Sequence, residues 1–148
     1  MTVIAVRGRT MACDSAWSTD GRIATLKTKL VRLRSGAIYG SAGDSDDRSM
    51  LALVQDATRF EDFPSREVLE ELKGEFEALV LLPSGKLVNI DKEGAYEMAA
   101  PFAAIGNGAR VAIGAMAAGA SAKRAAELTC QWENGCKGPV HTMRPGRE

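Results

Sequence analysis

The sequence predicts an α+β fold, in which helices cover antiparallel sheets. Segments with strand character occur in groups, and helical segments occur in pairs between those groups. The chain shows no alternating strand–helix repeat, which separates it from the α/β class. With 148 residues it has room for one core and no second one of comparable size. We therefore expect a single domain over residues 1–148.

A hairpin is expected at the start of the chain. Val3 to Val6 and Thr10 to Cys13 are short apolar runs, and Arg7-Gly8-Arg9 between them contains the glycine that a tight turn favours. Both runs are almost continuously apolar, which indicates strands covered on both faces. Asp14 closes the second strand.

The next segment is expected to be irregular before strands resume. Residues 15–21 are polar and rich in turn formers, whereas residues 22–25 and 26–33 have extended character. Alternation does not fix which side of residues 26–33 faces inward. Residues 37–43 then predict a strand whose small side chains allow another backbone to approach closely.

Two helices are expected after that strand. Asp44 suits the N-cap, and the acidic residues up to Asp47 suit the positive end of a helix of about four turns. Its apolar residues recur at helical spacing: Met50, Leu51, Leu53, Val54 and Ala57. A shorter helix is expected to begin at Ser65, with a buried side formed by Val68, Leu69 and Leu72.

Antiparallel strands are expected again in the second half. Residues 77–82 and 87–90 flank Pro83-Ser84-Gly85-Lys86 and predict a second hairpin, and residues 95–99 predict one more strand. This group of strands completes the pattern on which the α+β class rests.

Two further helices follow these strands. Residues 103–105 lead into Gly106-Asn107-Gly108, after which a helix of small residues is expected to end at Gly119. Ser121 is expected to cap a last helix that continues to Trp132.

The end of the chain is expected to contain a loop over residues 133–138, a short strand over residues 140–143 and a frayed tail over residues 144–148. His141, the only histidine, would lie in that strand. A single histidine excludes a multi-histidine metal site and leaves a histidine-dependent triad one candidate base.

Charge and composition exclude other classes of protein. Lysine plus arginine and aspartate plus glutamate number 19 each, so no overall field attracts nucleic acid or a membrane surface. No apolar run approaches the ~20 residues that cross a bilayer, and the N-terminus lacks a secretory signal pattern. We expect a cytoplasmic protein without nucleic-acid or membrane partners.

The three cysteines, Cys13, Cys130 and Cys136, are expected to be reduced and structural. Their number is odd, and their spacing does not match a zinc knuckle. No cofactor and no metal are expected.

Thr2 directly follows the initiator methionine, and its small side chain would let a methionine aminopeptidase expose it as a new N-terminus. A free α-amino group has an ordinary pKa of about 8 and can accept the proton of the adjacent hydroxyl. One residue would then supply both the nucleophile and its base.

Five short motifs follow one another along the chain: Thr2 at the start of the first hairpin, Asp14 at its end, Leu26-Lys27-Thr28-Lys29-Leu30-Val31-Arg32-Leu33, Gly40-Ser41-Ala42-Gly43-Asp44, and Ala104-Ile105-Gly106-Asn107-Gly108-Ala109. Their order and spacing resemble the proteasome β-subunit and bacterial HslV peptidase family over nearly the whole chain. The resemblance implies an Ntn-hydrolase fold, a four-layer αββα sandwich with two antiparallel sheets between helix layers and the N-terminal residue in the cleft.

The resemblance also implies the catalytic residues of a threonine endopeptidase. Thr2 would attack a peptide carbonyl while its α-amine shuttles the proton. Lys29 would lower the pKa of the threonine hydroxyl, and Asp14 would keep that lysine charged and oriented. Gly43 would place a backbone N–H in the oxyanion hole, where a fixed donor contributes about 3–4 kcal/mol to transition-state stabilisation.

Two features depart from the family pattern. Family members usually carry a serine near the N-terminal amine where this chain has Asn107, whose amide can hydrogen-bond to the amine but cannot relay a proton. A late aspartate-containing loop is not clear in Glu133-Asn134-Gly135-Cys136. The chain is also short, with a tight first hairpin, which suggests a pared-down, phage-like version.

The implied partners are a peptide or unfolded protein as substrate, further copies in a homo-oligomeric ring, and an ATP-driven AAA+ unfoldase that the resemblance allows. Two other functions stay open. The departures at Asn107 and in the late loop favour a catalytically inactive, proteasome-like scaffold or assembly protein, and an Ntn amidase acting on small substrates is a third alternative.

Lys27 lies two positions before Lys29 and is the rival for its role. Trp17 and Trp132 are expected in packing or subunit contacts.

Overall fold

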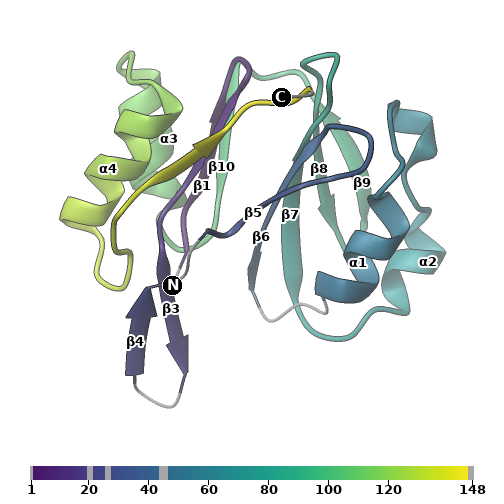
Figure 1. Ribbon diagram of the computed structural model, residues 1–148, viewed down its shortest axis with the longest axis horizontal. Coiled ribbons are helices and arrows are strands. Elements are labelled where there is room, and N and C mark those ends of the chain that lie inside the picture. Colours follow the sequence, from purple (N-terminus) through teal and green to yellow (C-terminus); the bar gives the residue numbers. More distant parts are fainter. Residues whose placement is uncertain (1, 20–21, 26–27, 44–46, 147–148) are drawn as a thin grey trace.

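The computed structural model describes residues 2–19, 22–25, 28–43 and 47–146. Within these ranges, two antiparallel sheets face each other (Figure 1). The first sheet has the order β10-β1-β2-β11 and consists of β1 (Ile4–Arg7), β2 (Thr10–Cys13), β10 (Phe102–Ile105) and β11 (His141–Met143). The second has the order β5-β6-β7-β8-β9 and consists of β5 (Leu30–Arg32), β6 (Ile38–Gly43), β7 (Phe76–Leu81), β8 (Leu87–Asp91) and β9 (Gly94–Met98).

Helices form the outer layers. In Figure 1, α3 (Ala109–Ala117) and α4 (Ala122–Trp132) lie beside the first sheet, and α1 (Asp47–Val54) and α2 (Arg66–Glu70) lie beside the second. A short 3-10 helix, η1 (Phe60–Asp62), connects α1 to α2. The predicted α+β class, with helix layers outside two antiparallel sheets, is therefore confirmed. No helix in the described ranges is long and apolar enough to cross a membrane.

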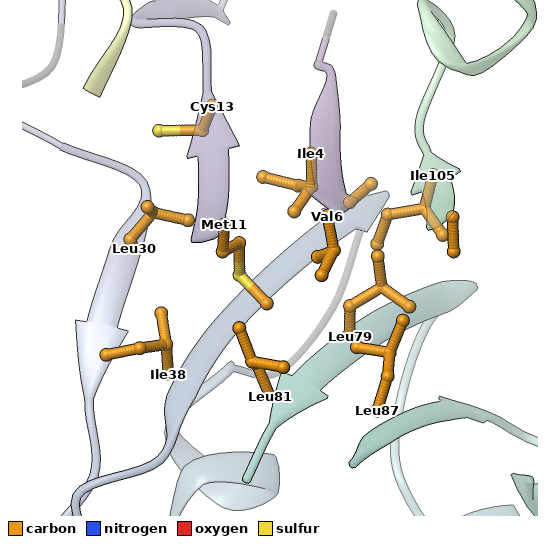
Figure 2. Packing of buried hydrophobic residues seen from close by; sticks show 12 residues of the cluster. Ile4, Val6, Met11, Cys13, Leu30, Ile38, Leu79, Leu81, Leu87 and Ile105 are labelled. Atoms are coloured by element: carbon orange, nitrogen blue, oxygen red, sulfur yellow. The ribbon is translucent and has the colours of Figure 1, made fainter. Parts of the chain in front are cut away.

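Three buried clusters correspond to the three interfaces between these layers. The central cluster lies between the sheets, where Ile4, Val6 and Met11 point toward Leu79 and Leu81 (Figure 2). The other two clusters lie between the first sheet and α3/α4, and between the second sheet and α1/α2. Both faces of each sheet are thus covered, which explains the continuous apolar runs in the sequence.

The two sheets approach closely at Gly40. A Cβ added there would lie 2.9 Å from Cγ2 of Ile4 and 3.1 Å from the sulfur of Met11. Side chains of the first sheet thus pack directly on the Gly40 backbone, which agrees with the tight packing expected for residues 37–43. This contact brings the strand that ends at Gly43 next to the strand that follows Thr2.

Most predicted elements are present with shifts of one or two residues at their ends. Both predicted hairpins form, β1–β2 and β7–β8. Ser121 is the N-cap of α4, and its hydroxyl accepts the Arg124 N–H at 3.1 Å. Ser65 is the N-cap of α2, as predicted.

The first helix is shorter than expected. α1 ends at Val54, before Ala57, and the predicted cap Asp44 lies outside the described residues. The backbone carbonyl of Gln55 accepts the Ser35 N–H at 3.1 Å, and its side-chain oxygen accepts the Arg34 N–H at 3.0 Å. The helix therefore ends before Gln55, which accepts hydrogen bonds from the backbone of the turn that precedes β6.

Two strands were not expected. Residues 16–19, predicted to form turns, are β3 (Ala16–Thr19), which pairs with β4 (Arg22–Thr25) in a two-stranded ribbon. The residues between the paired Thr19 and Arg22 are Asp20-Gly21, a dipeptide that strongly favours a two-residue hairpin and outweighs the polar character of the segment. Residues 102–105 form β10 because they pair along the free edge of β1.

The tail is held further than predicted. The Arg32 guanidinium donates to the carbonyl of Arg144 at 3.0 Å and to that of Gly146 at 2.5 Å, and the Gly146 N–H donates to the Gly36 carbonyl at 2.9 Å. Arg32 belongs to β5, an edge strand of the second sheet, so residues 144–146 are fixed against that sheet. The tail sequence alone could not predict these contacts, because the donor is far away in the chain.

Candidate active site

Thr2 lies directly before β1 and is held by the turn between β10 and α3. The Gly108 N–H donates to the Thr2 carbonyl at 3.1 Å. A Cβ added to Gly106 would lie 2.2 Å from that same carbonyl oxygen, and the Gly106 φ of +91° is itself a conformation that favours glycine. The Gly106-Asn107-Gly108 turn therefore fixes the backbone of Thr2.

Lys29 connects the Thr2 hydroxyl to Asp14. Its Nζ lies 3.1 Å from Oγ1 of Thr2 and 2.8 Å from Oδ1 of Asp14. The lysine side chain is 9% exposed and that of Asp14 is 0% exposed, so solvent screens this ion pair little. Lys27, the rival, lies outside the described residues.

Asp14 accepts hydrogen bonds from several separate parts of the backbone. The Val3 N–H donates to Oδ1 at 3.1 Å, while the Ala16 and Lys137 N–H groups donate to Oδ2 at 3.1 and 3.3 Å. A buried carboxylate is costly unless it is paired and hydrogen-bonded, and this one is both. The network also fixes its two oxygens, and with them the position of the Lys29 ammonium.

The loop over residues 133–139 completes the support of Asp14. Besides the Lys137 N–H, the Lys137 carbonyl accepts the Ser15 N–H at 2.7 Å, and the Ser15 hydroxyl donates to the Pro139 carbonyl. This loop lacks the aspartate of the family pattern. Its contribution comes from backbone groups, which leave no signal in the pattern of side chains.

Gly43 and Asn107 share a hollow of about 360 Å³ beside Thr2. Gly106, which abuts Thr2, is part of the same wall, so the hollow adjoins Thr2 on the side of the β10–α3 turn. Gly43 has a φ of +99°, and a Cβ there would lie 2.6 Å from the Glu75 carbonyl oxygen. Only glycine fits this end of β6.

The thiols near the site are poorly suited to act as nucleophiles. Burial raises the pKa of Cys13, and burial is also the main reason why the pKa values of Cys130 and Cys136 rise to about 11. A thiol must lose its proton to attack, so these groups stay largely inert near neutral pH. All three are free cysteines that pack among buried residues, in agreement with the structural role predicted for them.

His141 lies in β11 opposite Cys13, as the strand prediction required. Its Nε2 is buried and has no hydrogen-bond partner among the residues that the structure describes. In the part of the chain that the structure describes, no group of three or more metal-ligating side chains comes together.

The structure thus places Thr2, Lys29 and Asp14 in direct contact, and Gly43 and Asn107 at an adjoining hollow. An ammonium that donates to a hydroxyl stabilises the oxyanion that forms when the hydroxyl loses its proton. The arrangement can therefore activate Thr2 Oγ1. The catalytic roles of these residues remain predictions.

No protein-family model and no curated protein sequence matches this chain. Solved structures do match it over almost its full length. Thiobacillus denitrificans BPH has 18% sequence identity and a TM-score of 0.69, with 100% of both chains covered. The same protein in complex with epoxomicin has 16% identity and a TM-score of 0.66, with 99% of each chain covered.

The eukaryotic HslV from Trypanosoma brucei is similar in the same way. It has 20% identity and a TM-score of 0.70, and the match covers 97% of this chain and 99% of that one. Similarity at this level of identity shows the fold. Together with the observed layers, it confirms the predicted Ntn-hydrolase fold, a four-layer αββα sandwich.

Proposed function

We propose that this chain is an N-terminal threonine endopeptidase in which Thr2 becomes the nucleophile after removal of Met1. The observation that carries the proposal is the position of Lys29 Nζ, 3.1 Å from Oγ1 of Thr2 and 2.8 Å from the buried carboxylate of Asp14. A threonine without a role in the site would not be expected to contact a buried ion pair.

The proposed reaction proceeds in two steps. The free α-amine of Thr2 accepts the hydroxyl proton as Oγ1 attacks the peptide carbonyl, and the resulting oxyanion accepts a hydrogen bond from the Gly43 N–H. The protonated amine then gives its proton to the departing amine of the substrate, which leaves an ester on Thr2. Water then gives a proton to the same amine as it attacks that ester. The acyl group leaves as a carboxylic acid, and the amine returns the proton to Oγ1, which regenerates the hydroxyl.

Lys29 and Asp14 act electrostatically in this scheme. The lysine charge stabilises Oγ1 as it loses its proton, and Asp14 balances that charge in a buried position where an isolated ammonium would be costly. Because Asp14 also accepts the Val3 N–H at 3.1 Å, it ties the lysine to the backbone directly after the nucleophile. The site is therefore organised before substrate binds.

The comparisons support this proposal at the level of fold. One similar structure is described as a complex with epoxomicin and another as an HslV, and this chain matches both over nearly its full length. By analogy we propose peptide or unfolded protein substrates, a homo-oligomeric ring, a cytoplasmic location and an AAA+ unfoldase partner.

A catalytically inactive, proteasome-like scaffold is the second candidate. It is favoured by Asn107, which lines the hollow beside Thr2 where the family-like serine would stand. An amide cannot pass on a proton, so the cycle of the α-amine would lack a relay.

Cleavage of an unstructured protein such as casein, followed by mass spectrometry, distinguishes the two candidates. The peptidase proposal predicts cleavage by the wild type, its loss in Thr2→Ala and unchanged cleavage in the control Thr142→Ala, an exposed residue of β11. A wild type that lacks Met1 but cleaves nothing, together with an Asn107→Ser variant that gains activity, would establish the scaffold instead. Cleavage that persists in Thr2→Ala would show that Thr2 is not the nucleophile.

A further inference from the structure

The hollow beside Thr2 is acidic. Glu75 and Glu77 line it together with Phe76, and the described residues of its wall include no lysine or arginine. Gly106 belongs to the same wall, and a Cβ added to it would lie 3.4 Å from Cβ of Thr2, so the acidic surface adjoins Thr2 through Gly106.

The alternation of β7 turns Glu77 toward that space. Leu79 and Leu81 belong to the cluster between the sheets, whereas Ala78 and Val80 belong to the cluster under α1 and α2. Glu77 is two residues before Leu79 and therefore shares its face, which is the face toward the sheet that carries Thr2. The Asn89 side chain donates to Oε2 of Glu77 at 3.2 Å and holds the carboxylate there.

A second carboxylate increases the negative charge at this end of the sheet. Asp91 of β8 is directly opposite Glu77 in the strand register. Opposite residues of an antiparallel pair lie on the same face, and like charges in this arrangement repel each other. A cation bound next to Glu77 would reduce that repulsion, so the unliganded hollow favours a positively charged ligand.

We propose that this hollow receives the lysine or arginine side chain of a substrate residue next to the scissile bond, so that the enzyme cleaves preferentially beside basic residues. The proposal rests on the proposed function and names its substrate class. Glu75 and Glu77 pair with the cationic head group of that side chain.

A pair of internally quenched peptides tests this preference. Both consist of alanines around one central residue, which is lysine in one peptide and norleucine, an uncharged analogue of similar shape, in the other. We expect kcat/KM of the wild type to be about fivefold or more higher for the lysine peptide, the size of one well-placed but partly exposed charge pair. The ratio should approach one in the Glu75→Gln/Glu77→Gln variant and with rising salt.

Glu67→Gln is the matched control. Glu67 is an exposed residue of α2, and α2 covers the other face of the second sheet. This variant removes one carboxylate without touching the hollow, so it should keep the wild-type ratio. Urea unfolding of all variants establishes that they are folded.

Binding to the Thr2→Ala protein separates this inference from the proposed function. Fluorescence anisotropy with labelled lysine and norleucine peptides should show tighter binding of the lysine peptide, and this difference should disappear in Thr2→Ala/Glu75→Gln/Glu77→Gln. Tighter binding of the lysine peptide without cleavage by the wild type would contradict the proposed peptidase activity, but it would support the binding of basic side chains in the hollow. Equal cleavage and equal binding of the two peptides, or a ratio unchanged by the glutamate substitutions, would overturn the inference and leave the peptidase in place.

Discussion

Asp14 is a fully buried carboxylate that receives hydrogen bonds from Val3, Ala16, Lys29 and Lys137. These donors come from the segment before β1, the ribbon, the segment before β5 and the late loop. A single side chain therefore connects four segments that are far apart in the sequence, and its loss should affect both the stability of the fold and the activity of the site.

We predict that Asp14→Ala lowers the free energy of unfolding by about 3–5 kcal/mol, because it leaves the Lys29 ammonium and three backbone N–H groups buried without their acceptor. Urea unfolding at pH 7 measures this change. The control is Asp56→Ala, which removes the carboxylate of the Arg34–Asp56 ion pair. The Asp56 side chain is 76% exposed. An exposed pair contributes at most about 1 kcal/mol. Equal effects of the two substitutions would contradict the buried network.

The thiols give a pH-dependent prediction. Burial raises the pKa of Cys130 and of Cys136 from 9.0 to about 11, so between pH 9 and 11 the unfolded chain loses thiol protons that the folded chain retains. Unfolding then releases protons, and stability should fall as the pH rises through this window. The free energy of unfolding of Cys130→Ala/Cys136→Ala should decline less steeply over the same range. An identical slope in the variant would show that the thiols do not cause the decline.

At the scale of elements, the turn between β10 and α3 matters most for the site. It contributes the Gly108 N–H to the Thr2 carbonyl at 3.1 Å and places Gly106 against the Thr2 backbone. The turn is able to do so because β10 pairs with β1 from Ile4↔Ile105 to Arg7↔Phe102. The pairing of β10 with β1 thus places this turn next to Thr2.

Gly106→Ala should abolish the activity attributed to Thr2, since its Cβ would lie 2.2 Å from the Thr2 carbonyl oxygen. Gly119→Ala is the matched control, because Gly119 also has a positive φ, +106°, but no neighbour within 4 Å of its Cβ position. Both variants should lose about 1 kcal/mol or more to backbone strain. Only Gly106→Ala should lose peptide cleavage, and comparable activity of the two variants would contradict the placement of the turn.

The elements also show what a single sequence can and cannot predict. The hairpins β1–β2 and β7–β8 were predicted because their turns contain glycine and their strands are apolar. The ribbon β3–β4 was not predicted because residues 15–21 are polar and rich in turn formers, although Asp20-Gly21 is itself a hairpin signal. β10 was missed because its pairing with the distant β1 has no local signal.

At the scale of the whole molecule, the layered fold brings together residues that are far apart in the sequence. Thr2, Asp14 and Lys29 meet at one end of the two sheets, and the hollow that contains Gly43 and Asn107 adjoins them. The resemblance indicated these residues in advance, since it rests on the order of short motifs. The Lys137 backbone contact and the acidic wall at Glu77 could not be predicted, because both depend on how distant segments pack.

The central claim is that Thr2 is a processed, activated nucleophile. Intact-mass spectrometry of the protein before and after incubation with epoxomicin, the compound present in one of the similar structures, tests it most directly. We predict a chain that lacks Met1, a single epoxomicin adduct that maps to Thr2, and no adduct in Thr2→Ala or Lys29→Met. Retention of Met1 on protein from a host with methionine aminopeptidase, or an adduct that persists in Thr2→Ala, would contradict the claim.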